Sequence, residues 1–144
     1  MNLDLKNLNI IDLISENHAK LRKIVSKTWI DMGKEGFTDT ESYILSLIEK
    51  NELTVAQISR IIGISRQGTH KCVKGLIEKD YIMIKNQDSI SRDKILSLTT
   101  KGKKFCEETL ILKEKFENEI IKFIGESNFK ILKECLSEDW LIDE

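Results

Sequence analysis

Hydrogen-bonding and cationic side chains repeat at helical spacing between residues 65 and 79. The i, i+3, i+4 and i+7 positions of this stripe hold Gln67, His70, Lys71 and Lys74. A second stripe with the same spacing starts two residues later and forms an apolar face: Thr69, Cys72, Val73 and Leu76. Because two residues correspond to about 200° of helix rotation, the two stripes lie on opposite faces. The pattern predicts a helix that is buried on one face and presents groups suited to a polyanion on the other.

The basic side chains are concentrated in the middle of the chain. The whole sequence carries a formal charge of −1 from 23 basic and 24 acidic residues. Residues 60–104 hold eleven basic and four acidic side chains, a net charge of +7, so the remainder carries −8. A merely solvated charged surface would mix the signs throughout, whereas this asymmetry favours a localised surface for a polyanion.

Length and composition exclude several classes of protein. The 144 residues fit one domain, and 40% apolar residues with no proline argue against disorder and a loop-rich scaffold. The three cysteines, Cys72, Cys106 and Cys135, are an odd number without CxxC spacing, which favours reduced thiols in a cytoplasmic protein. Neither a membrane-spanning apolar run nor a secretory signal is present, so we expect no membrane partner.

The patterns that catalysis and metal binding require are missing from the sequence. It shows no paired His and Cys spacing, no glycine-rich phosphate loop and no nucleophile elbow. His18 and His70 are too few to form a zinc site with scattered carboxylates. We therefore expect that the protein is not an enzyme and uses no cofactor or metal.

Two predicted helices precede the two-striped segment. Apolar residues at helical spacing predict a long helix from Leu8 to about Met32, ended by glycines. Thr38 and Glu41 fit a capping box, in which each side chain satisfies a backbone N–H of the other residue. The helix that this box opens is expected to end near Asn51.

A helix-turn-helix is predicted next. Thr54 and Gln57 fit a second capping box, and Gly63 ends the short helix that follows because glycine readily adopts the left-handed conformation. Ser65 is a good N-cap for the two-striped helix. Two short helices joined by a three-residue turn with glycine are typical of a helix-turn-helix.

The remaining sequence predicts a hairpin and a helical C-terminal region. Residues 81–85 and 94–99 are β-branched and aliphatic, and the intervening residues 86–93 are polar and turn-prone, which predicts a β-hairpin. Helical spacing returns at about Thr100 and is broken at Gly125. The predicted fold is mainly α with a small β-hairpin.

These motifs resemble those of the MarR family of winged helix-turn-helix transcriptional regulators. Residues 53–67, LTVAQISRIIGISRQ, resemble the helix-turn-helix of that family, and LTTKG at 98–102 matches its LTxxG motif at the exit of the wing. The resemblance covers essentially the whole chain. It implies one MarR-like domain over residues 1–144, with a winged lobe at 37–102 and dimerisation helices at 1–36 and 103–144.

The wing departs from the family pattern. The family's DxR signature falls on Ile90 and Arg92, so the arginine is kept and the acidic residue is lost, with Asp88 and Asp93 as possible substitutes. Asp80 stands where the family usually has glycine, a position that Asp can fill at a modest cost in left-handed conformation.

The resemblance implies sequence-specific binding of double-stranded DNA. Arg66 and Gln67, in the first turn after Ser65, are placed to read guanine and adenine in the major groove. Arg92 is placed to enter the minor groove. The other DNA-binding candidates are Ser65 and His70 with Lys71, Lys74 and Lys94, which would contact bases or phosphates.

We also predict a homodimer that binds a pseudo-palindromic operator, and the apolar C-terminal residues are the main reason. The apolar residues at 120–124 and 140–142 exceed what a small winged core can cover, and either a second copy or intramolecular packing would bury them. Family members often respond to a small aromatic or phenolic acid, and His18, Arg22 and Trp29 are the candidate effector pocket here. We expect a repressor that is released by such an effector. The alternative is a winged-helix module for protein–protein contact that has lost base recognition.

Overall fold

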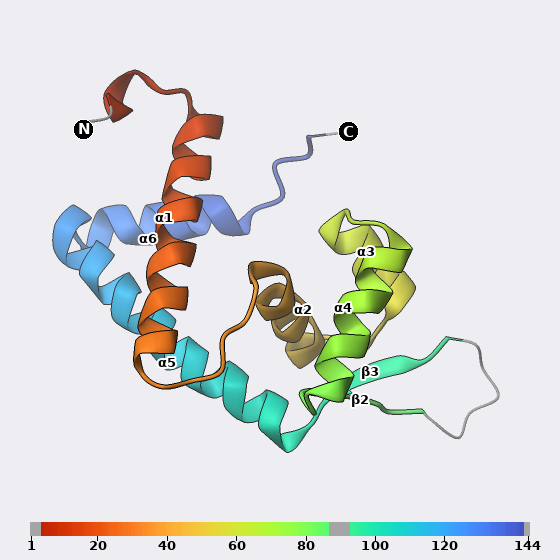
Figure 1. The fold of residues 1–144 in the computed structure, drawn as a ribbon. Helices are drawn as coiled ribbons and strands as arrows, with labels where there is room; N and C mark the ends of the chain where they lie inside the picture. Colours follow the sequence, from red (N-terminus) through yellow and green to blue (C-terminus); the bar gives the residue numbers. More distant parts are fainter. Residues whose placement is uncertain (1–3, 87–92, 143–144) are drawn as a thin grey trace. The chain divides into compact units, whose positions relative to one another are not determined.

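The computed structural model describes residues 4–86 and 93–142 and is mostly helical in these ranges (Figure 1). Its helices are α1 (Ile10–Asp31), α2 (Asp39–Lys50), α3 (Val55–Ile62), α4 (Arg66–Glu78), α5 (Thr100–Ile124) and α6 (Glu126–Ser137), with a short 3-10 turn at Leu5–Asn7. Its strands are β1 (Leu53–Thr54), β2 (Ile82–Ile84) and β3 (Ile95–Leu98). The chain divides into two compact units, residues 1–109 and residues 110–144, and α5 runs from the first into the second. The predicted fold class is confirmed.

The helix starts follow from the predicted caps. The Thr38 side chain accepts a hydrogen bond from the Glu41 N–H at 3.1 Å, and the Glu41 carboxylate accepts one from the Thr38 N–H at 2.9 Å. Thr54 and Gln57 make the same reciprocal pair at the start of α3. Gly63 ends α3 with φ of +71°, the left-handed conformation expected of it. The capping box at Thr54 and the left-handed conformation of Gly63 therefore set the two ends of α3, the first helix of the helix-turn-helix.

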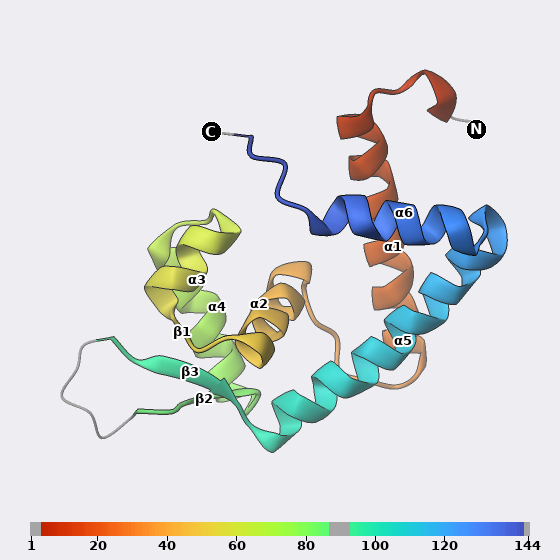
Figure 2. The same cartoon turned by 180° about the vertical axis from the view of Figure 1, so that it is seen from behind.

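A three-stranded antiparallel sheet has the order β1-β3-β2, in which β1 precedes the helix-turn-helix and β2 and β3 follow it (Figure 2). The predicted hairpin is confirmed, with Ile82 opposite Leu98 and Ile84 opposite Leu96. Strand β1 was not expected: Leu53 pairs with Leu96 on the other side of β3. Two residues are too few to show the alternation of a strand, and the same stretch carries the cap of α3.

The core of the first unit is built from α2, α3, α4 and the sheet, with further buried residues from α1 and the start of α5. Ile44, Ile58, Leu76 and Ile82 are at most 1% exposed. Thr69 is also fully buried, and its hydroxyl donates a hydrogen bond to the Ser65 carbonyl at 2.9 Å. The apolar stripe predicted for α4 therefore faces the core, although Cys72, which we expected to be buried with it, is only half-buried.

The LTTKG segment at 98–102 fastens the sheet to α5. The Thr99 N–H donates to the Tyr81 carbonyl at 3.1 Å, and the Thr99 hydroxyl donates to the Asp80 carbonyl. A Cβ at Gly102 would lie 2.2 Å from the Tyr81 carbonyl oxygen, so only glycine fits at this position. Asp80 has φ of +68°, which confirms the left-handed conformation predicted for it.

Residues 110–144 form the C-terminal part of α5, the helix α6 and a short extended segment. Gly125 separates the two helices with φ of +89°. Many apolar side chains of this unit are exposed, and Phe123 is 92% exposed. The others are Leu110, Ile111, Ile131, Leu132, Leu136, Trp140, Leu141 and Ile142. No helix within residues 4–86 and 93–142 is long and apolar enough to cross a membrane.

Candidate nucleic-acid interface

The polar stripe of α4 lies in solvent, as predicted. Each of its cationic and hydrogen-bonding side chains is exposed: Arg66, Gln67, His70, Lys71 and Lys74. On the opposite face Thr69, Val73 and Leu76 are buried against the rest of the lobe. The helix is therefore held from behind by its core residues while its charged face is unobstructed within the lobe.

Ser65 fixes the first turn of α4. Its side-chain oxygen accepts a hydrogen bond from the Gly68 N–H at 3.0 Å, and its carbonyl accepts one from the Thr69 N–H at 3.0 Å. A Cβ at Gly68 would stand 3.1 Å from the Ser65 hydroxyl oxygen, so glycine keeps room for this cap. The same cap orients Arg66 and Gln67, which follow directly, at the electropositive end of the helix.

The turn between α3 and α4 is held by side-chain as well as backbone bonds. The Ser59 hydroxyl donates to the Ile64 carbonyl at 2.8 Å, and the Gly63 N–H donates to the Ser59 carbonyl at 3.0 Å. We had not singled out Ser59, because a serine inside a short helix carries no distinctive pattern. Its bond ties the two helices together, so that α3 supports the position of α4.

The hairpin continues beyond its paired strands through Asn86. The Asn86 side chain accepts a hydrogen bond from the Ile95 N–H at 2.6 Å and donates one to the Asp93 carbonyl at 3.2 Å. This residue was also missed, since an asparagine in a polar turn looks like ordinary turn composition. The predicted wing residues Ile90 and Arg92 lie outside the described residues.

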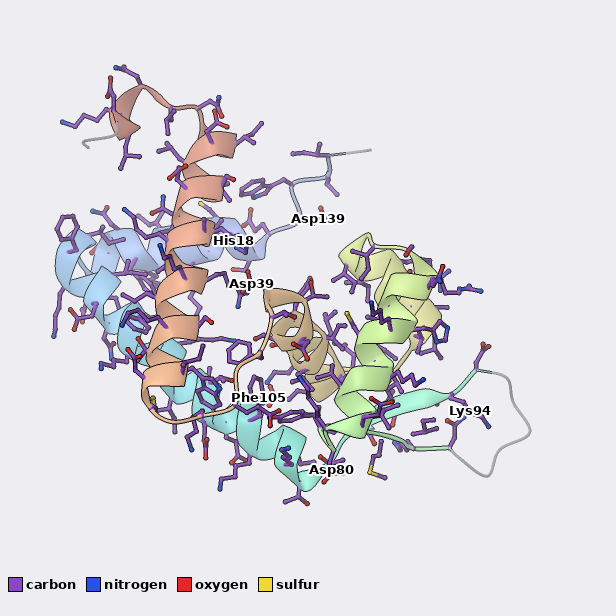
Figure 3. The ribbon with its side chains drawn as sticks, in the orientation of Figure 1. His18, Asp39, Asp80, Lys94, Phe105 and Asp139 are labelled. Carbon is purple, nitrogen blue, oxygen red and sulfur yellow. The ribbon has the colours of Figure 1, made fainter. Side chains whose placement is uncertain are left out.

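Cationic side chains from α4 and β3 border a half-open cavity of about 670 Å³. Arg66, His70 and Lys74 come from α4. The half-buried Lys94 directly precedes β3, and Figure 3 shows it at the end of the hairpin that is far from Asp80. The apolar lining residues that the structure describes are Val55, Ala56, Val73, Ile77, Ile84 and Leu96. The predicted DNA-binding residues Arg66, His70, Lys74 and Lys94 are thus brought together, and Glu78 and Asp93 supply the only acidic groups among the described lining residues.

The three residues of the predicted effector pocket differ in exposure. His18 is exposed, Arg22 is half-buried, and Trp29 is 3% exposed (Figure 3 labels His18 on α1). The Trp29 ring packs edge-on against Phe37 and Phe105 at centroid distances of 5.9 and 5.4 Å. Trp29 is therefore part of the aromatic core, whereas His18 lies on the exposed surface of α1.

A search for metal sites among residues 4–86 and 93–142 finds no group of three or more His, Cys, Asp or Glu side chains that could hold an ion. Among these residues Cys106 is buried, Cys72 is half-buried and Cys135 is exposed. The exposed face of α4 therefore presents hydrogen-bonding and positively charged side chains.

Comparisons with known proteins agree with this architecture. A sequence model described as MarR family matches residues 35–87. Wild-type MarR from E. coli has a similar structure, with a TM-score of 0.72 and 15% identity over 90% of this chain and 95% of that one. MepR, a transcription regulator of the Staphylococcus aureus multidrug efflux pump MepA, has a TM-score of 0.68 and 16% identity over the same shares.

A third similar structure is a MarR family protein from Mycobacterium tuberculosis in complex with salicylic acid. Its TM-score is 0.69 and its identity 17%, covering 90% of this chain and 95% of that one. A search of curated proteins gave no match. At these identities the solved structures show the fold, and the match over residues 35–87 covers the helix-turn-helix and the first strand of the hairpin.

Proposed function

We propose that this chain is a winged-helix regulator of the MarR family, as its motifs predicted, and that it binds double-stranded DNA sequence-specifically as a homodimer and represses transcription. The observation that supports the proposal most strongly is the exposed polar face of α4. It lies opposite the buried residues Thr69, Val73 and Leu76, and Ser65 caps the start of the helix. A major groove about 12 Å wide admits one such helix. Arg66 and Gln67 would read base edges, while Lys71, Lys74 and Lys94 would neutralise phosphates.

The homodimer is supported by apolar surface that the protomer leaves uncovered. Phe123 and the other exposed apolar residues of 110–144 have no cover within their own unit. Helix α1 also exposes Ile10 and Ile11, at 64% and 75%. Exposed apolar surface of this extent is typical of a protein interface. A two-fold assembly would bury it and present two recognition helices to a pseudo-palindromic operator.

Release by a small aromatic or phenolic acid is the second part of the proposal. The cavity beside α4 offers an apolar floor for a ring and cationic groups, Arg66, Lys74 and Lys94, for a carboxylate. An acid bound there would occupy side chains that DNA also needs, so it would compete with the operator. Ile77→Asn should then weaken the response to salicylate. Loss of the response in Arg22→Ala would instead support the pocket predicted at His18, Arg22 and Trp29.

Base reading is tested with operator fragments selected from the source genome. Arg66→Ala and Gln67→Ala should each cost about 1–3 kcal/mol of operator affinity and relax the preference at one position per half-site. Random DNA should be bound nearly as well as by the wild type. Lys20→Ala, an exposed change on α1, is the matched control. Equal losses on operator and random DNA would contradict a base-reading role.

Phosphate contact is tested by a salt titration. Lys74→Ala should weaken operator and random DNA alike and lower the slope of log K against log salt by about 1. Duplex affinity that is absent even at about 50 mM salt would contradict the proposal. That result would favour the alternative function, a winged-helix module for protein–protein contact.

A further inference from the structure

A chain of hydrogen bonds joins α1 to the end of the recognition helix through the linker at residues 32–38. The Trp29 indole N–H donates to the Glu35 carbonyl at 2.8 Å. The Glu35 carboxylate in turn accepts a hydrogen bond from the Tyr81 hydroxyl at 3.2 Å. Glu35 and Tyr81 are 46 residues apart, so this bond ties two segments that the local sequence does not connect.

Tyr81 also lies between the end of α4 at Glu78 and the start of the wing strand β2 at Ile82. Its N–H donates to the Leu76 carbonyl at 2.9 Å, and its carbonyl accepts from the Thr99 N–H at 3.1 Å. Figure 3 shows the neighbouring Asp80 at the root of the hairpin, near Phe105 on α5. A restraint on the Tyr81 side chain therefore acts on the end of α4 and on both strands of the wing.

The linker has little regular structure of its own. Residues 32–38 form a turn and an irregular segment that includes Gly33 at φ of +78°. Because such a segment can pivot, the bonds of Glu35 restrict it. Burial and the carboxylates of Glu35 and Glu41 raise the pKa of Tyr81 to about 12, so its hydroxyl remains a hydrogen-bond donor at neutral pH.

We propose that Glu35 and Tyr81, with Trp29, are positioning residues that fix α1 relative to the recognition helix and thereby set the separation of the two recognition helices in the dimer. The second half of this statement rests on the proposed function, in which α1 belongs to the dimer interface. The first half concerns one protomer and is testable without DNA.

The protomer test measures a distance within one chain. Spin labels are placed at Lys20 on α1 and Glu78 on α4, both exposed, after the three cysteines have been replaced by alanine, and labelled chains are diluted with unlabelled ones. Tyr81→Phe removes the hydroxyl and keeps the ring against Phe105, whose centroid is 5.5 Å away. Its distance distribution should be broader than that of the parent or shifted from it.

Matched variants separate this role from general packing. Tyr43→Phe deletes the hydroxyl of an exposed tyrosine on α2 and should leave the distribution unchanged. Glu35→Gln keeps an oxygen that accepts the Tyr81 hydrogen bond and should behave like the parent, whereas Glu35→Ala should behave like Tyr81→Phe. An unchanged distribution in both Tyr81→Phe and Glu35→Ala would overturn the proposal.

The DNA test uses duplexes with two half-sites at varied spacing. Tyr81→Phe should lose about 3- to 10-fold in affinity at the preferred spacing, the worth of one hydrogen bond, and should tolerate other spacings better. Binding to a single half-site should not change. Equal losses on every duplex, together with a lowered melting temperature, would indicate only a structural role. Absence of DNA binding by the wild type would refute the proposed function and leave the distance test intact.

Discussion

The winged lobe and the C-terminal residues 110–144 are both rich in helix, but they differ in what stabilises their helices. In the lobe α2, α3 and α4 each begin with a side-chain cap and contribute buried residues to the core. Helix α6 has no side-chain cap at Gly125 and contains no buried residue. A 12-residue helix without tertiary cover is marginal in water. The helices of the lobe are therefore stabilised by caps and buried residues, whereas α6 has neither.

Polar groups support the same distinction. Within the described residues no buried side-chain nitrogen or oxygen lacks a hydrogen-bond partner. The lobe thus combines a dense apolar core with satisfied polar atoms, which is what a single well-ordered arrangement requires. The C-terminal unit instead exposes many apolar side chains to solvent. In the proposed dimer, a second copy of the chain would cover them.

The same substitution in the two regions gives the largest expected contrast. Ile44 is 0% exposed and Ile111 is 69% exposed. Ile44→Ala should cost about 2–5 kcal/mol of unfolding free energy because it removes buried methyl groups and leaves a cavity. Ile111→Ala should change the stability of the protomer by less than about 0.5 kcal/mol. Urea denaturation at low protein concentration measures the unfolding free energy of both variants. Similar losses of stability would contradict the difference between the lobe and the C-terminal unit.

Association should be sensitive to the region that the protomer leaves uncovered. Phe123→Ala should weaken the dimer by about 1.5–3 kcal/mol for each side chain that a partner buries. Sedimentation across a range of concentrations measures the dissociation constant. Tyr43→Phe on the lobe serves as the control. An unchanged constant would show that Phe123 lies outside the interface, and a wild-type chain that remains a monomer would contradict the dimer itself.

Local signals explain why much of the lobe could be predicted from the sequence. The caps at Thr38, Thr54 and Ser65 act within three residues, and the stripes of α4 reflect helix geometry alone, so neither depends on the rest of the fold. The exposed positions of Gln67 and Lys74 followed from those stripes.

Contacts between distant segments were not visible in the sequence. The pairing of β1 with β3 joins residues about 40 positions apart, and the bond from Tyr81 to Glu35 is equally remote. The ring packing of Trp29 was hidden for the same reason: an aromatic residue on a helix looks alike whether it lines a pocket or packs against Phe37 and Phe105. These outcomes depend on tertiary packing, which periodicity does not report.

Two glycines distinguish backbone packing from helix propensity. Gly102→Ala should cost about 1–3 kcal/mol, because its Cβ would collide with the Tyr81 carbonyl and force the start of α5 away from the wing. Gly75→Ala in α4 is the matched control. No atom lies within 4 Å of a Cβ at that position, so this change should stabilise the helix by up to about 1 kcal/mol. Thermal melting compares the stability of the two variants. Equal changes in melting temperature would contradict the steric constraint proposed at Gly102.

The smallest expected effect is a dependence of lobe stability on high pH. Burial, and then the charges of Glu35 and Glu41, raise the pKa of Tyr81 from 10.0 to about 12. The folded state therefore holds the phenol proton more tightly than the unfolded chain does, and this contribution to stability is complete below pH 10 and lost between pH 10 and about 12.

Tyr81→Phe should flatten the fall in unfolding free energy over this interval, measured by urea denaturation at pH 9 to 12. Tyr43→Phe should keep the wild-type slope, since lysine deprotonation contributes alike to every variant. Parallel curves for the wild type and Tyr81→Phe would mean that the Tyr81 hydroxyl is not held in the folded lobe. Such a result would also count against the proposed role of the hydrogen bond between Tyr81 and Glu35, because that bond is made by the same hydroxyl group.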